Sequence, residues 1–224
     1  MLILGPLADR VFDAVIFDLD GTLIDSTAAI ERSWGTWMLE FGVDPGTAER
    51  HHGIPAAEIV RSLLPDRASH AEAIARIHHL ETTDVEGIVV LPGARAAMAA
   101  LSSAPNAIAT SGTVALARAR IGAAGLVPPS VLVTADDVRR GKPAPDPFLE
   151  AARCLGVDPG RCLVVEDAPQ GLVAARAAGC ATLAVVTTTN PEDLDADAVI
   201  PDLSAVRFDV RNDGISLQPA ADSV

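Results

Sequence analysis

The 224-residue sequence predicts an α/β protein, in which a parallel β-sheet carries helices on both faces and an all-helical segment is inserted. Two observations lead to this prediction. Short apolar runs of strand length alternate with helical patterns along most of the chain, which is typical of a parallel sheet. The stretch of residues 25–86 breaks this alternation, because it contains helical patterns and no convincing strand.

Each expected strand is an apolar run that is followed directly by polar residues. The first is VFDAVIF at residues 11–17, which ends in DLDGT. Strands that are buried on both faces read as continuous apolar runs, as this one does. The later ones are NAIAT (106–110), SVLVT (130–134), RCLVVED (161–167), ATLAVVT (181–187) and DAVI (197–200).

Three helical patterns separate most of these later strands, and each ends at a glycine, as helix C-termini often do. They are VALARARIGAAG (114–125), DPFLEAARCLG (146–156) and QGLVAARAAG (170–179). We expect the last twelve residues, DGISLQPAADSV, to be a frayed tail.

The insertion contains three further helical patterns, TAAIERSWGTWMLEFG (27–42), PAAEIVRSLL (55–64) and HAEAIARIHHLE (70–81). In the first, Ile30, Trp34, Trp37 and Phe41 recur on one helix face. We expect Trp34, Trp37 and Phe41 to pack inside the insertion, and a platform for the substrate is the alternative. The division that follows is an α/β core of residues 1–24 and 88–224 and a helical domain of residues 25–87. We expect the chain to cross between them near Leu23–Asp25 and Gly87–Pro92.

Composition excludes several classes of partner. A net charge of −13 argues against nucleic acid and anionic membrane surfaces. No apolar run reaches ~18 residues, and the N-terminus lacks the basic segment of a signal peptide. The three cysteines show no CxxC spacing, which predicts neither a disulfide framework nor a zinc site. We therefore expect a soluble cytoplasmic protein that binds a small molecule.

Polar residues at the strand ends are the candidates for a site, because ligands in open α/β sheets bind beyond the carboxyl ends of the strands. They are Asp18, Asp20, Thr110, Ser111, Asp136, Asp137, Glu166 and Asp167. In a pair such as Asp18 and Asp20, one carboxylate can attack phosphorus while the other handles a proton, if a cation screens the charge repulsion. Clustered oxygen ligands suit Mg²⁺.

Lys142 is the only lysine of the chain and lies in the proline-rich loop GKPAPDP. A compact ammonium suits a phosphate oxygen as a point charge. Thr110 and Ser111, followed by Gly112, add hydroxyl and backbone N–H groups near a helix start, which can bind an anion. An X-Pro bond is where a cis peptide costs least. We predict that the Lys142–Pro143 bond is cis, with the ammonium within about 5 Å of an Asp18 carboxylate oxygen.

The segments FDLDGTL, ATSG, GKPAPD and VVEDAPQG, in that order, resemble the four signature motifs of the haloacid dehalogenase-like (HAD) superfamily. The resemblance covers nearly the whole chain, and the insertion stands where subfamily I members carry a helical C1 cap. It implies a Rossmann-like core, with Asp18 as nucleophile and Mg²⁺ ligand and Asp20 as general acid/base that also binds the metal through its carbonyl. It further implies that Thr110, or Ser111 in its place, and Lys142 hold the phosphate, while Asp167 and Glu166 complete the metal shell.

Within the superfamily, the phrases HHGIP, DVEGIVVLPGA and ATSGT resemble the sugar- and polyol-phosphate phosphatases. This resemblance implies a Mg²⁺-dependent phosphatase that hydrolyses a small phosphorylated metabolite through an aspartyl-phosphate, as a monomer or weak homodimer. His52, in the cap loop HHGIP, is a candidate substrate contact.

Three alternatives stay open. A phosphomutase like β-phosphoglucomutase shares the cap and motifs, but it would carry a histidine and an arginine where this chain has Ile30 and Ala56. A dehalogenase would need neither the acid at Asp20 nor a metal. A catalytically idle binding protein of the family is expected to have lost an acid, and none is missing here.

Overall fold

The computed structural model describes residues 4–44 and 54–220. Six parallel strands form its central sheet, in the order β5-β4-β1-β6-β7-β8. Their bounds are β1 Ala14–Phe17, β4 Asn106–Ala109, β5 Val131–Val133, β6 Cys162–Glu166, β7 Ala181–Val185 and β8 Ala198–Ile200. All six lie inside the segments that the sequence predicts as strands, so the parallel sheet is confirmed.

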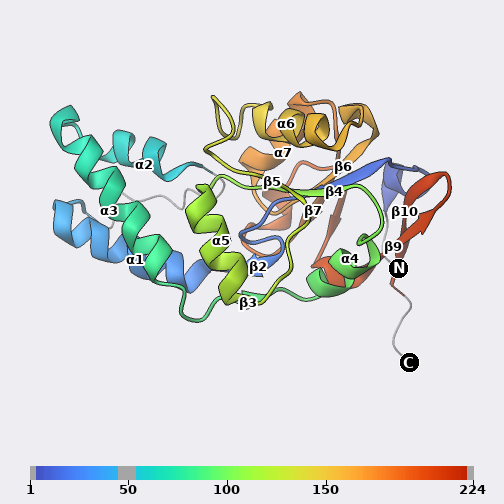
Figure 1. Cartoon of the computed structure of the whole chain (residues 1–224), viewed down its shortest axis with the longest axis horizontal. Coiled ribbons are helices and arrows are strands. Elements are labelled where there is room, and N and C mark those ends of the chain that lie inside the picture. The colour runs from blue at the N-terminus through green and yellow to red at the C-terminus, as the bar shows by residue number, and fades with distance from the viewer. Residues whose placement is uncertain (1–3, 45–53, 221–224) are drawn as a thin grey trace.

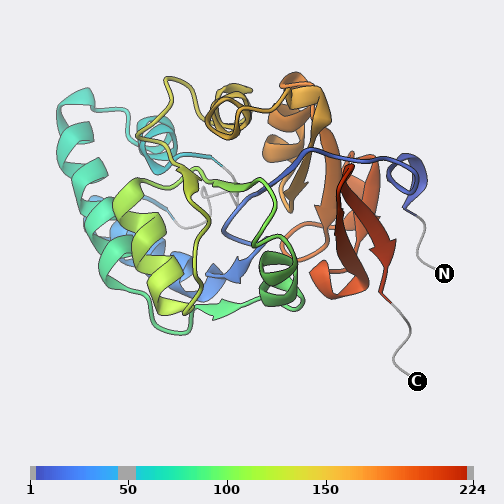
Figure 2. The ribbon, with the colours of Figure 1, turned by 45° about the vertical axis from the view of Figure 1, so that its right-hand side comes forward.

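Helices cover both faces of this sheet (Figures 1 and 2). The alternating side chains of β1 show how the two layers form, because Val15 and Phe17 belong to one apolar cluster and Ala14 and Ile16 to another. The first cluster takes in α4 (Ala94–Ala100) and α5 (Val114–Ala123), and the second takes in α6 (Asp146–Leu155) and α7 (Pro169–Ala177). β1 is therefore buried on both sides, as its unbroken apolar run predicts.

The predicted frayed tail is wrong for residues 214–219. This segment is strand β10 (Gly214–Pro219), which pairs antiparallel with β9 (Val206–Arg211). Ile215 and Leu217, each 1% exposed, join the core cluster of the sheet, and Ile215 also bridges to Phe12. The period-two alternation of GISLQP was the signal for a strand with one buried face.

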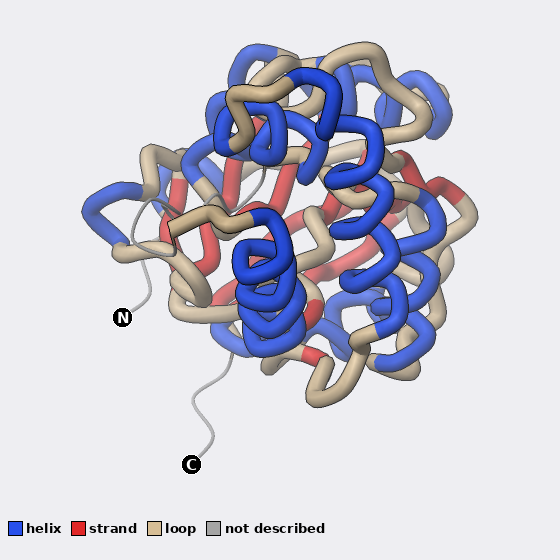
Figure 3. Tube along the Cα trace, turned by 90° about the vertical axis from the view of Figure 1, so that its left-hand side faces the viewer, coloured by secondary structure: helices blue, strands red, loops and turns tan. Residues whose placement is uncertain are grey.

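The insertion consists of α1 (Thr27–Phe41), α2 (Ala56–Leu63), the 3₁₀ turn Arg67–Ser69 and α3 (His70–Thr83), in agreement with the three predicted helices. It stands beyond the ends of the sheet strands, at the left of Figure 1, and faces the viewer in Figure 3. The chain enters it after β2 (Ile24–Asp25) and leaves it before β3 (Val89–Val90), near the two predicted crossings. These two strands pair with each other, Ile24 opposite Val90.

The insertion has an apolar cluster of its own. Trp37 is fully buried, donates its Nε1–H to the carbonyl of Ala73 at 2.9 Å, and stacks on Phe41 with ring centroids 5.0 Å apart. Trp34, Trp37 and Phe41 therefore pack inside the insertion, and Trp34 also lines the cavity described below. We call residues 25–87 the cap and residues 1–24 and 88–224 the core.

Short 3₁₀ helices connect the remaining elements of the core, at Gly5–Leu7, Pro159–Arg161, Pro191–Asp193 and Leu203–Ala205. None of the helices in the described part of the chain combines the length and the apolar character needed to cross a membrane.

Candidate active site

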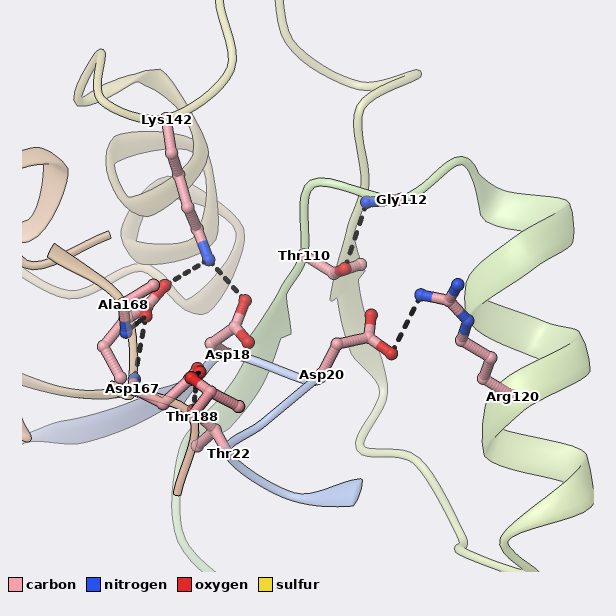
Figure 4. A network of polar contacts seen from close by, with 11 residues as sticks. Asp18, Asp20, Thr22, Thr110, Gly112, Arg120, Lys142, Asp167, Ala168 and Thr188 are labelled. Carbon is pink, nitrogen blue, oxygen red and sulfur yellow. Dashed lines mark hydrogen bonds and ion pairs between the residues drawn. The ribbon is translucent and has the colours of Figure 1, made fainter. Parts of the chain in front are cut away.

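The candidate residues meet where the three central strands end. Asp18 follows β1, Thr110 follows β4, and Glu166 and Asp167 end and follow β6. β1 lies between β4 and β6, so the chain connections diverge on either side of it. In open α/β sheets the crevice at such a switch point is the usual ligand site. Figure 4 shows the side chains that meet there.

Lys142 reaches this crevice from the loop between β5 and α6. Its side chain is fully buried, and its ammonium donates hydrogen bonds to Oδ1 of Asp18 and, at 2.6 Å, to Oε1 of Glu166. Burial alone would lower the pKa of Lys142, but the charges of Asp18 and Glu166 outweigh it and raise that pKa. The predicted proximity of Lys142 to Asp18 is confirmed, and the Lys142–Pro143 bond is cis as predicted.

Asp167 joins the two acids that contact the ammonium in a cluster of three buried carboxylates. One oxygen each of Asp18, Glu166 and Asp167 lies within 4.8 Å of the others. Burial, with the charges of Glu166 and Asp167, raises the pKa of Asp18 well above its usual range. Burial and the charge of Glu166 raise the pKa of Asp167 to about 7. The three carboxylates outnumber the one ammonium beside them, so a further positive charge in the cluster would be favourable.

A divalent cation fits this cluster. With all three acids ionised, Lys142 balances only one of them, and two negative charges stay uncompensated in a buried site. Carboxylate oxygens are the ligands that Mg²⁺ prefers. The donor chemistry and the excess charge thus agree with a magnesium site.

Glu166 is the most completely hydrogen-bonded of the three acids. Its Oε1 accepts from Lys142, and its Oε2 accepts from the backbone N–H groups of Asp167 and Ala168, both at 2.9 Å. It also packs against Gly171, where even a Cβ would overlap the carboxylate. Glu166 is therefore less available to a metal ion than the other two acids.

Asp167 is held by two threonines. The hydroxyl of Thr22 donates to its Oδ1 at 3.1 Å, and the hydroxyl of Thr188 donates to its Oδ2. Donors on both oxygens fix the carboxylate beside Asp18. Sequence reasoning found neither threonine.

Two of the phosphate-binding candidates, Thr110 and Ser111, follow β4, which neighbours β1 on the side opposite β6. Thr110 is 3% exposed, and its hydroxyl accepts a hydrogen bond from the backbone N–H of Gly112 at 3.1 Å. Thr110 and Ser111 both line the cavity described below. The other strand-end acids have local roles, since Asp136 accepts from the N–H of Val114 at the start of α5 and Asp137 accepts from Thr134.

Asp20 points away from Lys142, towards α5 (Figure 4). Its Oδ1 accepts a hydrogen bond from the hydroxyl of Ser26 at 2.6 Å and contacts Nη1 of Arg120 at 2.9 Å. Sequence reasoning missed Arg120. The available signal was its position on the apolar face of α5, where Leu116, Ala117 and Ile121 are also buried.

A cavity of about 550 Å³ opens between the strand ends and the cap. The core contributes its acids, Thr110 and Ser111, and the cap contributes an apolar wall that includes Ile30, Trp34, Met38 and Ile59. This volume is typical of sites for small molecules. His52 lies outside the described residues.

Comparisons with known proteins agree with this geometry. The family model described as haloacid dehalogenase-like hydrolase matches residues 12–179. Hexitol phosphatase A from Escherichia coli (strain K12) is 43% identical over 197 residues, which cover 85% of this chain and 91% of the relative. Glycerol-1-phosphate phosphohydrolase 2 from Saccharomyces cerevisiae is 33% identical over 199 residues, 82% of this chain and 78% of the relative.

The fold also recurs in solved structures. A β-phosphoglucomutase from Clostridium difficile has a TM-score of 0.76 and 22% identity, with 86% of this chain and 92% of that one covered. At that identity the likeness extends to the fold alone. Because the family model and the curated relatives each cover most of the chain, this protein belongs to the haloacid dehalogenase-like hydrolase family.

Proposed function

We propose that this protein is a Mg²⁺-dependent phosphatase that hydrolyses a small sugar or polyol phosphate monoester through an aspartyl-phosphate on Asp18. The observation that carries the proposal is the contact between the buried Lys142 ammonium and Asp18, inside an acidic cluster that faces a cavity. The names of the hexitol phosphatase and the glycerol-1-phosphate phosphohydrolase support the substrate class.

In the first step, a carboxylate oxygen of Asp18 attacks phosphorus and the bond to the ester oxygen breaks. Lys142 and the hydroxyl and N–H groups around Thr110 hold the phosphate oxygens in line for this attack. The leaving alkoxide takes a proton from the carboxyl group of Asp20 and departs as an alcohol.

In the second step, the ionised Asp20 removes a proton from water, which attacks the phosphorus of the aspartyl-phosphate. Inorganic phosphate leaves, and Asp18 and the protonated Asp20 are restored. The side chains of Asp18 and Asp167, the carbonyl of Asp20 and, more weakly, Glu166 would hold the magnesium ion. That ion would screen the repulsion between the attacking carboxylate and the phosphate.

The cap supplies the remaining conditions for this chemistry. Its apolar wall over the strand ends keeps bulk water from the reacting groups and leaves room for a small ester. The substrate's hydroxyl groups would meet the residues of the cap that line the cavity. Selection among sugar and polyol phosphates is therefore a property of the cap.

The test is the release of inorganic phosphate from a panel of hexitol, hexose and glycerol phosphates, with Mg²⁺ and without bisphosphate. We expect hydrolysis by the native protein and a loss of ~10³-fold or more in kcat for Asp18→Asn, because the amide cannot form the acyl-phosphate. Asp9→Asn, an exposed control, should keep full activity. Near-native turnover by a folded Asp18→Asn variant would refute the mechanism.

The same panel separates a phosphatase from a phosphomutase. Ile30 and Ala56, which replace the polar residues expected in a mutase, both line the cavity and offer no charge to a second phosphate. We expect free phosphate as the product. Interconversion of a sugar 1-phosphate and 6-phosphate with little phosphate release would instead identify a mutase.

A further inference from the structure

Arg120 has no part in the reaction steps above, yet it contacts one of their central groups. It lies on α5 and is 4% exposed. Its Nη1 contacts Oδ1 of Asp20 at 2.9 Å, and its Nη2 contacts Oε1 of Glu81 at 3.1 Å. In Figure 4 the guanidinium approaches Asp20 from the side opposite Lys142.

The three residues belong to different parts of the molecule. Asp20 follows strand β1 of the core, Arg120 lies on the core helix α5, and Glu81 lies on the cap helix α3. Helices α3 and α5 pack against each other, and Glu81 is only 5% exposed between them. One guanidinium therefore connects the carboxylate at the strand end with the cap.

Stability does not account for this arrangement. Arg120 and Glu81 are buried and Asp20 is partly exposed, so the arrangement removes charged groups from water, and apolar residues of similar size commonly stabilise a protein as well or better. The contact with Asp20 is also asymmetric. Among the described residues, both hydrogen-bonding partners of its side chain, Ser26 and Arg120, bind Oδ1, which leaves Oδ2 for the substrate.

We propose that Arg120 is a positioning residue, which holds Asp20 for proton transfer and, through Glu81, makes that orientation depend on the position of the cap. This inference rests on the phosphatase function proposed above. When the cap lies over the strand ends, Glu81 and Asp20 share the guanidinium and Oδ2 faces the cavity. When the cap moves away, Arg120 loses Glu81 and is held less firmly, so Asp20 keeps Ser26 but loses part of the support for its orientation.

The test compares two substrates that differ in their need for an acid. From a sugar or polyol phosphate the leaving group is an alkoxide, which needs a proton from Asp20, whereas p-nitrophenolate leaves without one. We expect Arg120→Met to lower kcat/KM by about tenfold to a hundredfold for glycerol phosphate and only a few-fold for p-nitrophenyl phosphate. Arg118→Ala, an exposed change on the same helix, should alter neither.

Two further sets of variants decide whether Arg120 acts through Asp20. In an Asp20→Ala background, Arg120→Met should cause no further loss, because the group that it positions is gone. Glu81→Gln, which keeps a hydrogen-bond acceptor, should leave kcat/KM for glycerol phosphate almost unchanged. Glu81→Ala should lower it several-fold with little effect on p-nitrophenyl phosphate.

Thermal melts establish that each variant is folded, and the Glu81 pair carries the test if Arg120→Met does not fold. Equal losses for the two substrates, or a full additional loss in the Asp20→Ala background, would overturn the positioning role. If the native protein hydrolysed neither ester, the proposed phosphatase function itself would be refuted. That outcome is distinguishable from a failure of the positioning role alone.

Discussion

The ammonium of Lys142 donates a hydrogen bond to Oδ1 of Asp18, although 124 positions separate the two residues in the chain. The chain returns through β4 and β5, and both Asp18 and the loop of Lys142 follow the carboxyl ends of strands in the same parallel sheet, which brings the two residues together. Lys142 is also the single lysine of the sequence, so no other ammonium side chain can replace it. Its charge offsets those of the buried carboxylates of Asp18 and Glu166.

Replacing Lys142 by methionine should therefore destabilise the metal-free protein as well as inactivate it. The change leaves the carboxylates of Asp18 and Glu166 buried without their partner, which typically costs about 3–5 kcal/mol of unfolding free energy. Urea denaturation in the presence of EDTA measures this loss of unfolding free energy. Arg140→Met, which removes a largely exposed pair with Asp146, should cost less than about 1 kcal/mol. Equal stability of the two variants would contradict the role of Lys142.

Mg²⁺ should raise the melting temperature of the native protein, and EDTA should lower it and abolish hydrolysis. The ion would balance the excess charge of the three buried acids and so bind the folded state preferentially. Ca²⁺ prefers more ligands at longer distances and should restore little activity. In Asp167→Asn the stabilisation by Mg²⁺ should be largely lost. A melting temperature that does not respond to Mg²⁺ at millimolar concentration would rule out the site.

Gly141 should tolerate no side chain while the cap is closed. A Cβ at this position would lie 2.5 Å from Cγ of Pro55, at the start of the cap helix α2. We expect Gly141→Ala to reduce kcat/KM several-fold because the cap can no longer rest on the loop of Lys142. Gly122→Ala on α5 meets nothing within 4 Å and should keep full activity while stabilising the helix by up to about 1 kcal/mol. Indistinguishable kinetics of the two variants would show that this contact is unimportant.

The C-terminal hairpin should contribute measurably to stability. Leu217 on β10 is 1% exposed, so Leu217→Ala should lower the unfolding free energy by about 2–5 kcal/mol. Val210→Ala, on the facing strand β9, removes a side chain that is 37% exposed and should cost about 1 kcal/mol or less. Denaturant titration separates the two. A small effect of Leu217→Ala would mean that the hairpin is detached from the core in solution.

The sequence predicts the elements of this fold better than the contacts between them. Runs such as NAIAT are strands because an element buried on both faces must be apolar throughout, and this requirement is visible locally. The hairpin at Ile215 was missed because its short alternating pattern stands among proline, glycine and acidic residues that also favour loops.

The same limit applies to the site: residues with a local sequence signal could be predicted, and residues defined by long-range contacts could not. Asp18, Lys142 and Asp167 could be found because each directly follows a strand or lies in a distinctive loop. Arg120 could not be assigned a role, since its two partners lie on β1 and on a cap helix and nothing near Arg120 in the sequence encodes them. Only the packing of α3 on α5 brings the three charges together.

The pairing of Ile24 with Val90 has a consequence for how this enzyme family can diversify. β2 and β3 pair like the two strands of a β-hairpin. Residues 26–88, which include nearly the whole cap, form the connection between them, where a turn of two residues would be enough. A loop can be lengthened, shortened or exchanged without changing the register of the strands that carry Asp18, Thr110 and Asp167. The acids and the lysine can thus stay constant while the cap adapts to each new ester.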